Sequence, residues 1–192
     1  MAKLTRDKIV SVAHQALVEG GRDNVVLRGV ARELGVTAPA LYDHFRSRSA
    51  LLLALTEIGY RDLIAATDVA GDTAIERVRE RALAYVEFAG ENPALFQLMF
   101  LFRPEAVELE TEDGVAVDNE LDVATEAFEQ GAADLRLAMA DGDLREGDVT
   151  RTAMAIWTAM HGAATIALTA PSVASDIATD VIDTLLAGLS PD

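Results

Sequence analysis

Apolar residues recur every three or four positions along almost the whole chain, which is the period of an amphipathic α-helix. No long segment alternates apolar and polar residues in the manner of a strand. The apolar runs predict the helices, and the Gly, Pro, Asn and Thr residues between the runs predict where each helix begins and ends. We expect nine, at about residues 6–20, 27–34, 38–44, 48–67, 74–89, 93–102, 119–140, 149–169 and 176–188. The pattern therefore predicts an all-α protein.

Residues between the apolar runs support these helix boundaries. Thr5 and Asp148 are suited to cap the first and the eighth helix, because their side-chain oxygens accept from free backbone N–H groups. The pair Gly20 and Gly21 suits the end of the first helix. The segment 104–118 is acidic and has no helical period, so we expect a long loop there.

Two short helices joined across "GVT" lie between two longer helices in the first third of the chain. This order predicts a helix-turn-helix, in which Gly35 allows the tight turn. Leu41 and Phe45 are four residues apart and are expected to anchor the second short helix in the core. The other side chains around that helix are then expected to face mostly outward, namely Thr37, Ala38, Ala40, Tyr42, Asp43 and His44.

The same region resembles a known family. The stretch "VVLRGVARELGVTAPALYDHFRSRSALLLAL" is similar to the N-terminal domain of TetR-family transcriptional regulators. The similarity lies in three features: the Arg-x-Val-Ala-x-x-Leu-Gly-Val-Thr core, the Leu-Tyr-x-His-Phe ending and the basic residue that opens the next helix. This resemblance covers roughly residues 5–62. The C-terminal part resembles one branch of the family, whose ligand-binding domain carries Trp-x-x-x-His-Gly, here Trp157, His161 and Gly162.

The resemblance implies a three-helix helix-turn-helix domain that binds DNA over residues 1–47. It implies a helical ligand-binding and dimerisation domain over residues 48–192, with the helix at 48–67 linking the two. Such regulators are usually repressors, and two recognition helices about 34–36 Å apart would read a near-palindromic operator. The helices at about 149–169 and 176–188 are the candidates for the homodimer face, since both are too apolar for a monomer surface.

The charge of the chain is unevenly distributed, and this bears on DNA as a partner. The formal net charge of −16 by itself argues against a nucleic-acid partner. Residues 1–62, however, hold nine Lys or Arg and seven Asp or Glu, whereas residues 63–192 hold seven basic and twenty-five acidic residues. We therefore expect DNA to be approached through the N-terminal region only.

The resemblance places the start of the second short helix against base edges in the major groove. The residues expected there are Thr37, Ala38, Pro39 and Ala40. Small apolar side chains allow the helix to approach the bases closely and can contact thymine methyl groups. They make no bidentate hydrogen bonds to guanine or adenine. Phosphate contacts are expected from Thr37, Tyr42, His44 and Arg48, and a base or phosphate contact from Arg28.

Two positions depart from the family pattern. The second helix begins near Val26, where the family often has Ser or Thr, so a cap is missing. Asp43 brings a carboxylate close to DNA, where it either accepts from a cytosine amine or repels phosphate, and repulsion is favoured. Asp43 and the scarcity of lysine also support an alternative function, a small-molecule-binding or protein-interaction module with a non-functional DNA-binding head.

In this family the region between the later helices commonly forms a pocket for a small, often apolar, effector. We expect Phe96, Met99, Trp157 and His161 to line such a pocket. The alternative is a purely structural role, because aromatic residues and Met at helical spacing are typical of a core. A lone histidine beside an aromatic ring is likewise typical of a satisfied core residue.

Other function classes are not expected. The chain has no cysteine and only three histidines, without paired spacing, so no metal site and no cofactor are predicted. No nucleophile–base arrangement is evident, which argues against an enzyme. The uncharged stretch 152–175 contains threonines, a histidine and Pro171, and fits a buried helix better than a membrane span. With no signal peptide evident at "MAKLTRDKIV", the protein is expected to be cytoplasmic.

Overall fold

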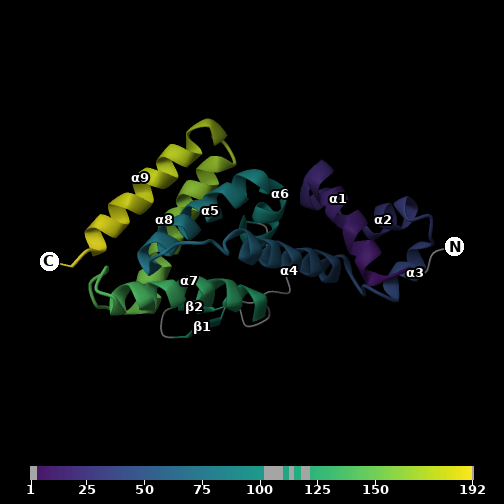
Figure 1. Cartoon of the computed structure of the whole chain (residues 1–192). Helices are drawn as coiled ribbons and strands as arrows, with labels where there is room; N and C mark the ends of the chain where they lie inside the picture. Colours follow the sequence, from purple (N-terminus) through teal and green to yellow (C-terminus); the bar gives the residue numbers. More distant parts are fainter. Residues whose placement is uncertain (1–3, 102–109, 113–114, 118–121, 192) are drawn as a thin grey trace. The chain divides into compact units, whose positions relative to one another are not determined.

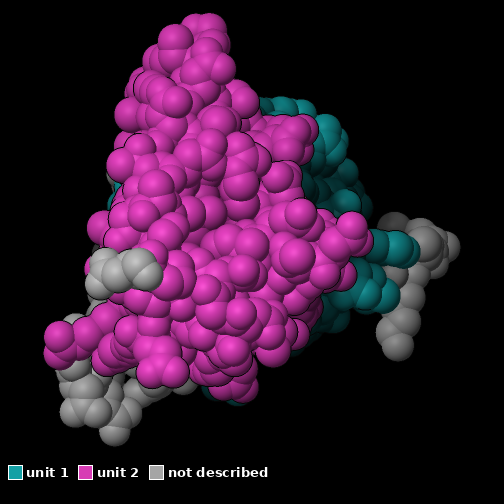
Figure 2. Space-filling view, turned by 60° about the vertical axis from the view of Figure 1, so that its left-hand side comes forward, with its two compact units in different colours: residues 1–59, 94–108 teal, residues 60–93, 109–192 magenta. Residues whose placement is uncertain are grey.

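The computed structural model describes residues 4–101, 110–112, 115–117 and 122–191. The chain divides into two compact units, which Figure 2 colours separately. Unit 1 comprises residues 1–59 and 94–108, and unit 2 comprises residues 60–93 and 109–192. The sequence-based boundary between residues 47 and 48 differs from this division and stays a prediction. None of the helices in the described ranges combines the length and the apolar character that a bilayer span requires.

Unit 1 combines the short helices α2 and α3 with the longer α1 and the start of α4 (Figure 1), and these helices share one apolar core. Its elements are α1 (Arg6–Asn24), α2 (Leu27–Glu33), α3 (Ala38–Tyr42), the first part of α4 (Arg48–Ala66), most of α6 (Pro93–Phe96) and the π-helical turn η1 (Gln97–Leu101). The core is supplied by large side chains that are almost completely buried, namely Ile9, Leu17, Leu41, Phe45, Leu51, Leu52, Leu55, Leu95 and Leu98. The predicted inward positions of Leu41 and Phe45 are thereby confirmed.

The turn between α2 and α3 has the geometry that its glycine allows. Gly35 has φ = 67°, a left-handed conformation that strains any residue with a side chain. The Gly35 N–H donates to the carbonyl of Arg32, and the Val36 N–H donates to the carbonyl of Ala31. These two bonds satisfy the last carbonyls of α2 and end the helix where the sequence predicts.

Unit 2 is a helical assembly in which α5 (Ala74–Glu91) packs against α7 (Asp122–Ala140), α8 (Val149–Ala167) and α9 (Pro171–Leu189). α8 also packs along α9, as Figure 1 shows. Thr5 accepts from the N–H of Lys8 and Asp148 from the N–H of Arg151, so both predicted caps, in unit 1 and unit 2, are confirmed. In the part of the chain that the structure describes, nine α-helices confirm the predicted all-α class.

Several helix or loop boundaries differ from the sequence-based expectation. α1 continues to Asn24 rather than ending at Gly20 and Gly21, because the backbone leaves helical geometry only at these two glycines and the helix then resumes. α9 begins at Pro171 rather than near residue 176, because proline suits the first helical turn, where no N–H bond is needed. The sixth helix is α-helical only to Phe96 and continues as η1. The expected loop at 104–118 contains two strands, β1 (Glu110–Glu112) and β2 (Val115–Val117), which pair antiparallel. The rest of that expected loop lies outside the described residues.

A buried carboxylate joins three parts of unit 2. Asp134 on α7 is 7% exposed and accepts from Arg77 Nε and from Arg81 Nη2, both at 2.8 Å. Arg77 also donates to the carbonyl of Gly71, and Arg81 to the carbonyl of Thr67, directly after α4. The cluster therefore ties α7 and α5 to the end of α4 and to the connection that follows it.

Candidate nucleic-acid interface and ligand-binding residues

The short helix α3 presents one buried and one exposed face. Thr37 occupies the N-cap position with an extended backbone, and its side chain makes no capping hydrogen bond. Leu41 is 0% exposed and holds α3 on the core, whereas the neighbouring Tyr42 is 51% exposed. A hydroxyl and a phenol on the outer side of a short helix are groups that donate to phosphate or base oxygens.

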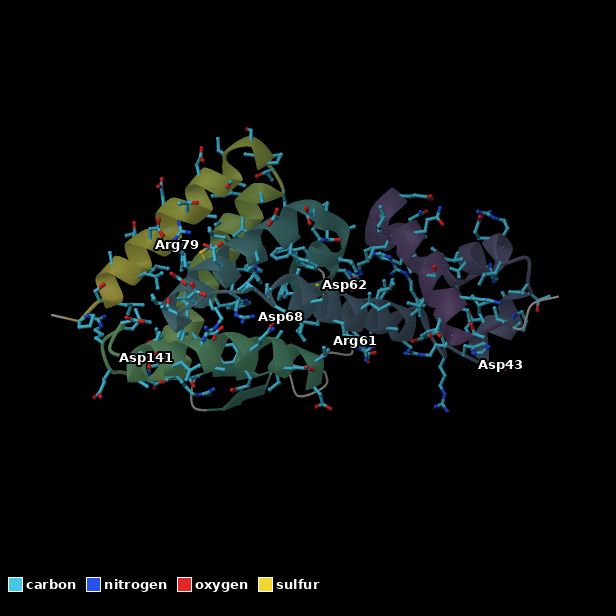
Figure 3. The ribbon with its side chains drawn as sticks, viewed as in Figure 1. Asp43, Arg61, Asp62, Asp68, Arg79 and Asp141 are labelled. Atoms are coloured by element: carbon cyan, nitrogen blue, oxygen red, sulfur yellow. The ribbon has the colours of Figure 1, made fainter. Side chains whose placement is uncertain are left out.

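The structure places most of the predicted DNA-contacting side chains on the surface of unit 1, but Ala38 packs partly against the core, contrary to its expected outward position. Arg28, Thr37, Pro39, Tyr42, Asp43 and His44 are exposed, while Ala38 and Ala40 are partly buried. Figure 3 labels Asp43 beside α3. The missing side-chain cap of α2 at Val26 is confirmed. DNA contact by these residues stays a prediction.

Arg48, the first residue of α4, is held differently from the other predicted contact residues. Its Nε donates to the carbonyl of Val25 at 2.8 Å, and its Nη2 donates to the carbonyl of Arg22 at 2.6 Å. Asp23 Oδ1 lies 3.5 Å from the same Nη2. The Arg48 guanidinium thus contacts the end of α1, and its expected phosphate contact stays a prediction.

Arg6 is a residue that sequence reasoning missed. Its guanidinium carbon lies 4.9 Å from the centroid of the Phe45 ring, a cation–π distance. The contact places a positive charge beside Phe45, three residues after the end of α3. No sequence signal indicates it, because the two residues lie on different elements and their spacing has no period.

A polar cluster lies within the helices of unit 2. The Tyr85 hydroxyl on α5 lies 2.8 Å from Nδ1 of His161 on α8. The rings of Trp157 and His161, one turn apart on α8, have centroids 5.2 Å apart. Burial raises the pKa of Tyr85, and a hydrogen bond from the Trp157 indole N–H opposes that shift. Tyr85 was missed by the sequence, since nothing in its local context distinguishes it from a core tyrosine.

The four predicted ligand-binding residues fall into different units. Phe96 and Met99 belong to the segment 94–108 of unit 1 and are 0% exposed, and the Phe96 and Phe100 rings are 4.9 Å apart. Trp157 is 37% exposed and His161 half-buried, both in unit 2. A pocket shared by all four stays a prediction.

The half-buried His161 makes the stability of unit 2 sensitive to pH. Burial lowers the pKa of His161 below that of an ordinary histidine, about 6.5, so the ring of the folded protein is neutral at pH 7. When the pH falls below the pKa that His161 has in the unfolded chain, the unfolded state binds a proton before the folded state does. The free energy of unfolding therefore decreases until the pH reaches the lower pKa of the folded state. We expect the unfolding temperature of the wild type to fall, relative to that of His161→Gln, between pH 7.5 and 5.5. The His14→Gln variant is the control, and a pH-independent difference between wild type and His161→Gln would contradict the assignment.

Two family models match the chain. The model described as "Bacterial regulatory proteins, tetR family" matches residues 9–55, and "Tetracyclin repressor-like, C-terminal domain" matches residues 78–189. The second match spans more than half of the chain. The chain therefore belongs to the tetR family of bacterial regulatory proteins, as its resemblance predicts.

Individual relatives agree with this membership. The tetracycline repressor protein class A from transposon 1721 of Escherichia coli is 46% identical over 57 residues, which are 30% of this chain and 26% of that protein. An HTH-type transcriptional regulator from Mycobacterium bovis is 33% identical over 98 residues, or 48% of this chain and 42% of that protein. The matched part is thus less than half the length of these curated relatives.

Solved structures extend the similarity over the whole chain. A protein of unknown function from Rhodococcus sp. RHA1 is 30% identical, with a TM-score of 0.81, over 99% of this chain and 97% of its own. The TetR-family transcriptional regulator PfmR from Thermus thermophilus is 23% identical, with a TM-score of 0.65, over 95% of this chain and 99% of its own. The second comparison shows a common fold.

Proposed function

We propose that the protein is a dimeric transcriptional repressor that binds a near-palindromic operator through its helix-turn-helix and is released by a small effector. The observation that carries this proposal is the exposed face of α3, where Thr37 and Tyr42 project from a helix anchored by the buried Leu41. A protruding second helix with polar groups at its exposed positions is the arrangement that enters a major groove.

Dimerisation through α8 and α9 is supported by apolar side chains that unit 2 leaves at its surface. Trp157, Ile166 and Val173 are 37%, 36% and 44% exposed, on α8 and α9. Burying such side chains against a second copy would stabilise the assembly. The helices concerned run from 149 to 167 and from 171 to 189, rather than over the ranges expected from the sequence.

The effector is proposed to be small, apolar and uncharged. Trp157, His161 and Gly162 match the Trp-x-x-x-His-Gly pattern of one family branch, and membership of that branch is part of the proposal. His161 and the Tyr85 hydroxyl bonded to it bring no formal charge to this place at pH 7, which suits an uncharged effector. Phe96 and Met99 are retained as proposed ligand residues from the family resemblance.

Selection of bound duplexes from a random-sequence pool, followed by mobility-shift titration, tests the DNA-binding function. Tyr42→Phe is expected to weaken binding of the selected duplex about tenfold, because a hydrogen bond to a charged phosphate is lost. The Val18→Ala variant is the control, since Val18 is 63% exposed on α1 and is not one of the predicted contact residues. Failure of the wild type to bind any duplex at low salt would favour the alternative, a binding module with a non-functional head.

A further inference from the structure

We infer that Arg48 is a positioning residue for operator recognition, which fixes α4 to the connection between α1 and α2, rather than a phosphate contact. The inference rests on the proposed DNA-binding function. It starts from the observation that the Arg48 guanidinium is bonded to main-chain carbonyls of unit 1.

The end of α1 is irregular, and side-chain hydrogen bonds support it in addition to those of the backbone. The helix is interrupted at Gly20 and Gly21, and Gly21 has φ = 70°, which a residue with a side chain rarely adopts. The chain then turns, and the Asn24 side chain donates back to the carbonyl of Ala16 at 3.0 Å. The Arg22 carbonyl accepts from the Val25 N–H at 3.2 Å, which closes the turn after the interruption.

Arg48 adds two directed side-chain bonds to this turn. The carbonyls of Arg22 and Val25 each accept from a different nitrogen of its guanidinium. Val25 is completely buried and directly precedes Val26, the N-cap of α2. One side chain at the start of α4 therefore fixes the point at which the chain enters the helix-turn-helix.

The geometry requires arginine. The planar guanidinium presents several N–H donors in a fixed fork, whereas the lysine ammonium is a compact point charge on a flexible stem. A lysine at this position keeps the positive charge but does not reproduce two directed bonds from separate nitrogens. A phosphate contact, by contrast, is satisfied by either residue.

Because only the positioning role requires arginine, a comparison of Arg48→Lys with Arg48→Ala distinguishes the two roles. Arg46→Ala is the matched control for removal of a positive charge. Arg46 is exposed and lies two residues before Arg48. Binding to the selected operator duplex and to an unrelated duplex is measured by calorimetry over a salt series, at a temperature where every variant is folded. Thermal unfolding and amide hydrogen exchange of residues 22–30 are measured without DNA.

If Arg48 is a positioning residue, Arg48→Lys and Arg48→Ala behave alike. Operator affinity falls about tenfold in both, while binding to the unrelated duplex and the salt slope stay unchanged in Arg48→Lys. The unfolding temperature drops by about 4–8 °C in both, as expected for the loss of hydrogen bonds from a charged donor. Exchange in residues 22–30 becomes faster.

Three results would overturn the inference. A phosphate contact would leave Arg48→Lys close to the wild type and would reduce the salt slope of Arg48→Ala by about one. A purely stabilising role would lower the unfolding temperature while the folded variants keep full operator affinity. If the wild type selects no duplex, the proposed function fails, whereas unchanged exchange and unfolding in Arg48→Lys would reject the positioning contact itself.

Discussion

Replacing Asp134 by alanine is expected to lower the free energy of unfolding by about 3–5 kcal/mol, since removing one partner of a buried ion pair leaves the others uncompensated. The Arg77 and Arg81 side chains are only 25% and 15% exposed, so water replaces the lost carboxylate poorly. Urea unfolding followed by circular dichroism measures the loss. Asp134→Asn keeps the shape and removes the charge, and is expected to lose a large part of the same stability.

The control for this prediction lies on the same helix. Glu129 and Arg136 form an ion pair at 3.0 Å whose side chains are about half exposed, at 53% and 50%. Because exposed pairs contribute little, Glu129→Ala is expected to cost less than about 1 kcal/mol. Equal losses in Asp134→Ala and Glu129→Ala would show that the Asp134 cluster is not a buried ionic network.

Replacing Leu41 by alanine is expected to cost about 2–5 kcal/mol, because it leaves a cavity where a fully buried leucine anchored α3. The same urea titration measures the loss. Operator binding is expected to weaken as well, since α3 would lose its fixed place on the core.

Tyr42 provides the matched comparison one residue away. Its side chain is 51% exposed, so Tyr42→Ala is expected to change stability by less than about 0.5 kcal/mol while still weakening operator binding. A large stability loss in Tyr42→Ala, or none in Leu41→Ala, would contradict the assignment of the two faces of α3.

Features that depend on neighbouring residues were predictable from the sequence. The caps at Thr5 and Asp148 involve residues three positions away, and the inward placement of Leu41 and Phe45 follows from helical spacing. The stop at Gly35 follows from its tolerance of positive φ. Each of these features is decided within about one helical turn.

Features that join distant segments were not predictable from the sequence. Asp134 meets Arg77 and Arg81 across 57 and 53 residues, and Tyr85 meets His161 across 76. Nothing in the local pattern identifies which of many acidic residues is buried. The start of α9 was predicted wrongly for a different reason. A proline can end one helix and also suits the first turn of the next, so Pro171 by itself did not indicate which of the two applied.

Trp157 is the only tryptophan of the 192 residues, and it lies in contact distance of His161. Its intrinsic fluorescence therefore reports on one place in unit 2, with no background from other indoles. Any molecule that enters beside His161, and any proton that the ring gains, changes the surroundings of that single emitter. Because the chain also lacks cysteine, a thiol introduced anywhere can carry an acceptor dye at a unique position. The protein thus contains its own optical reporter for an effector search.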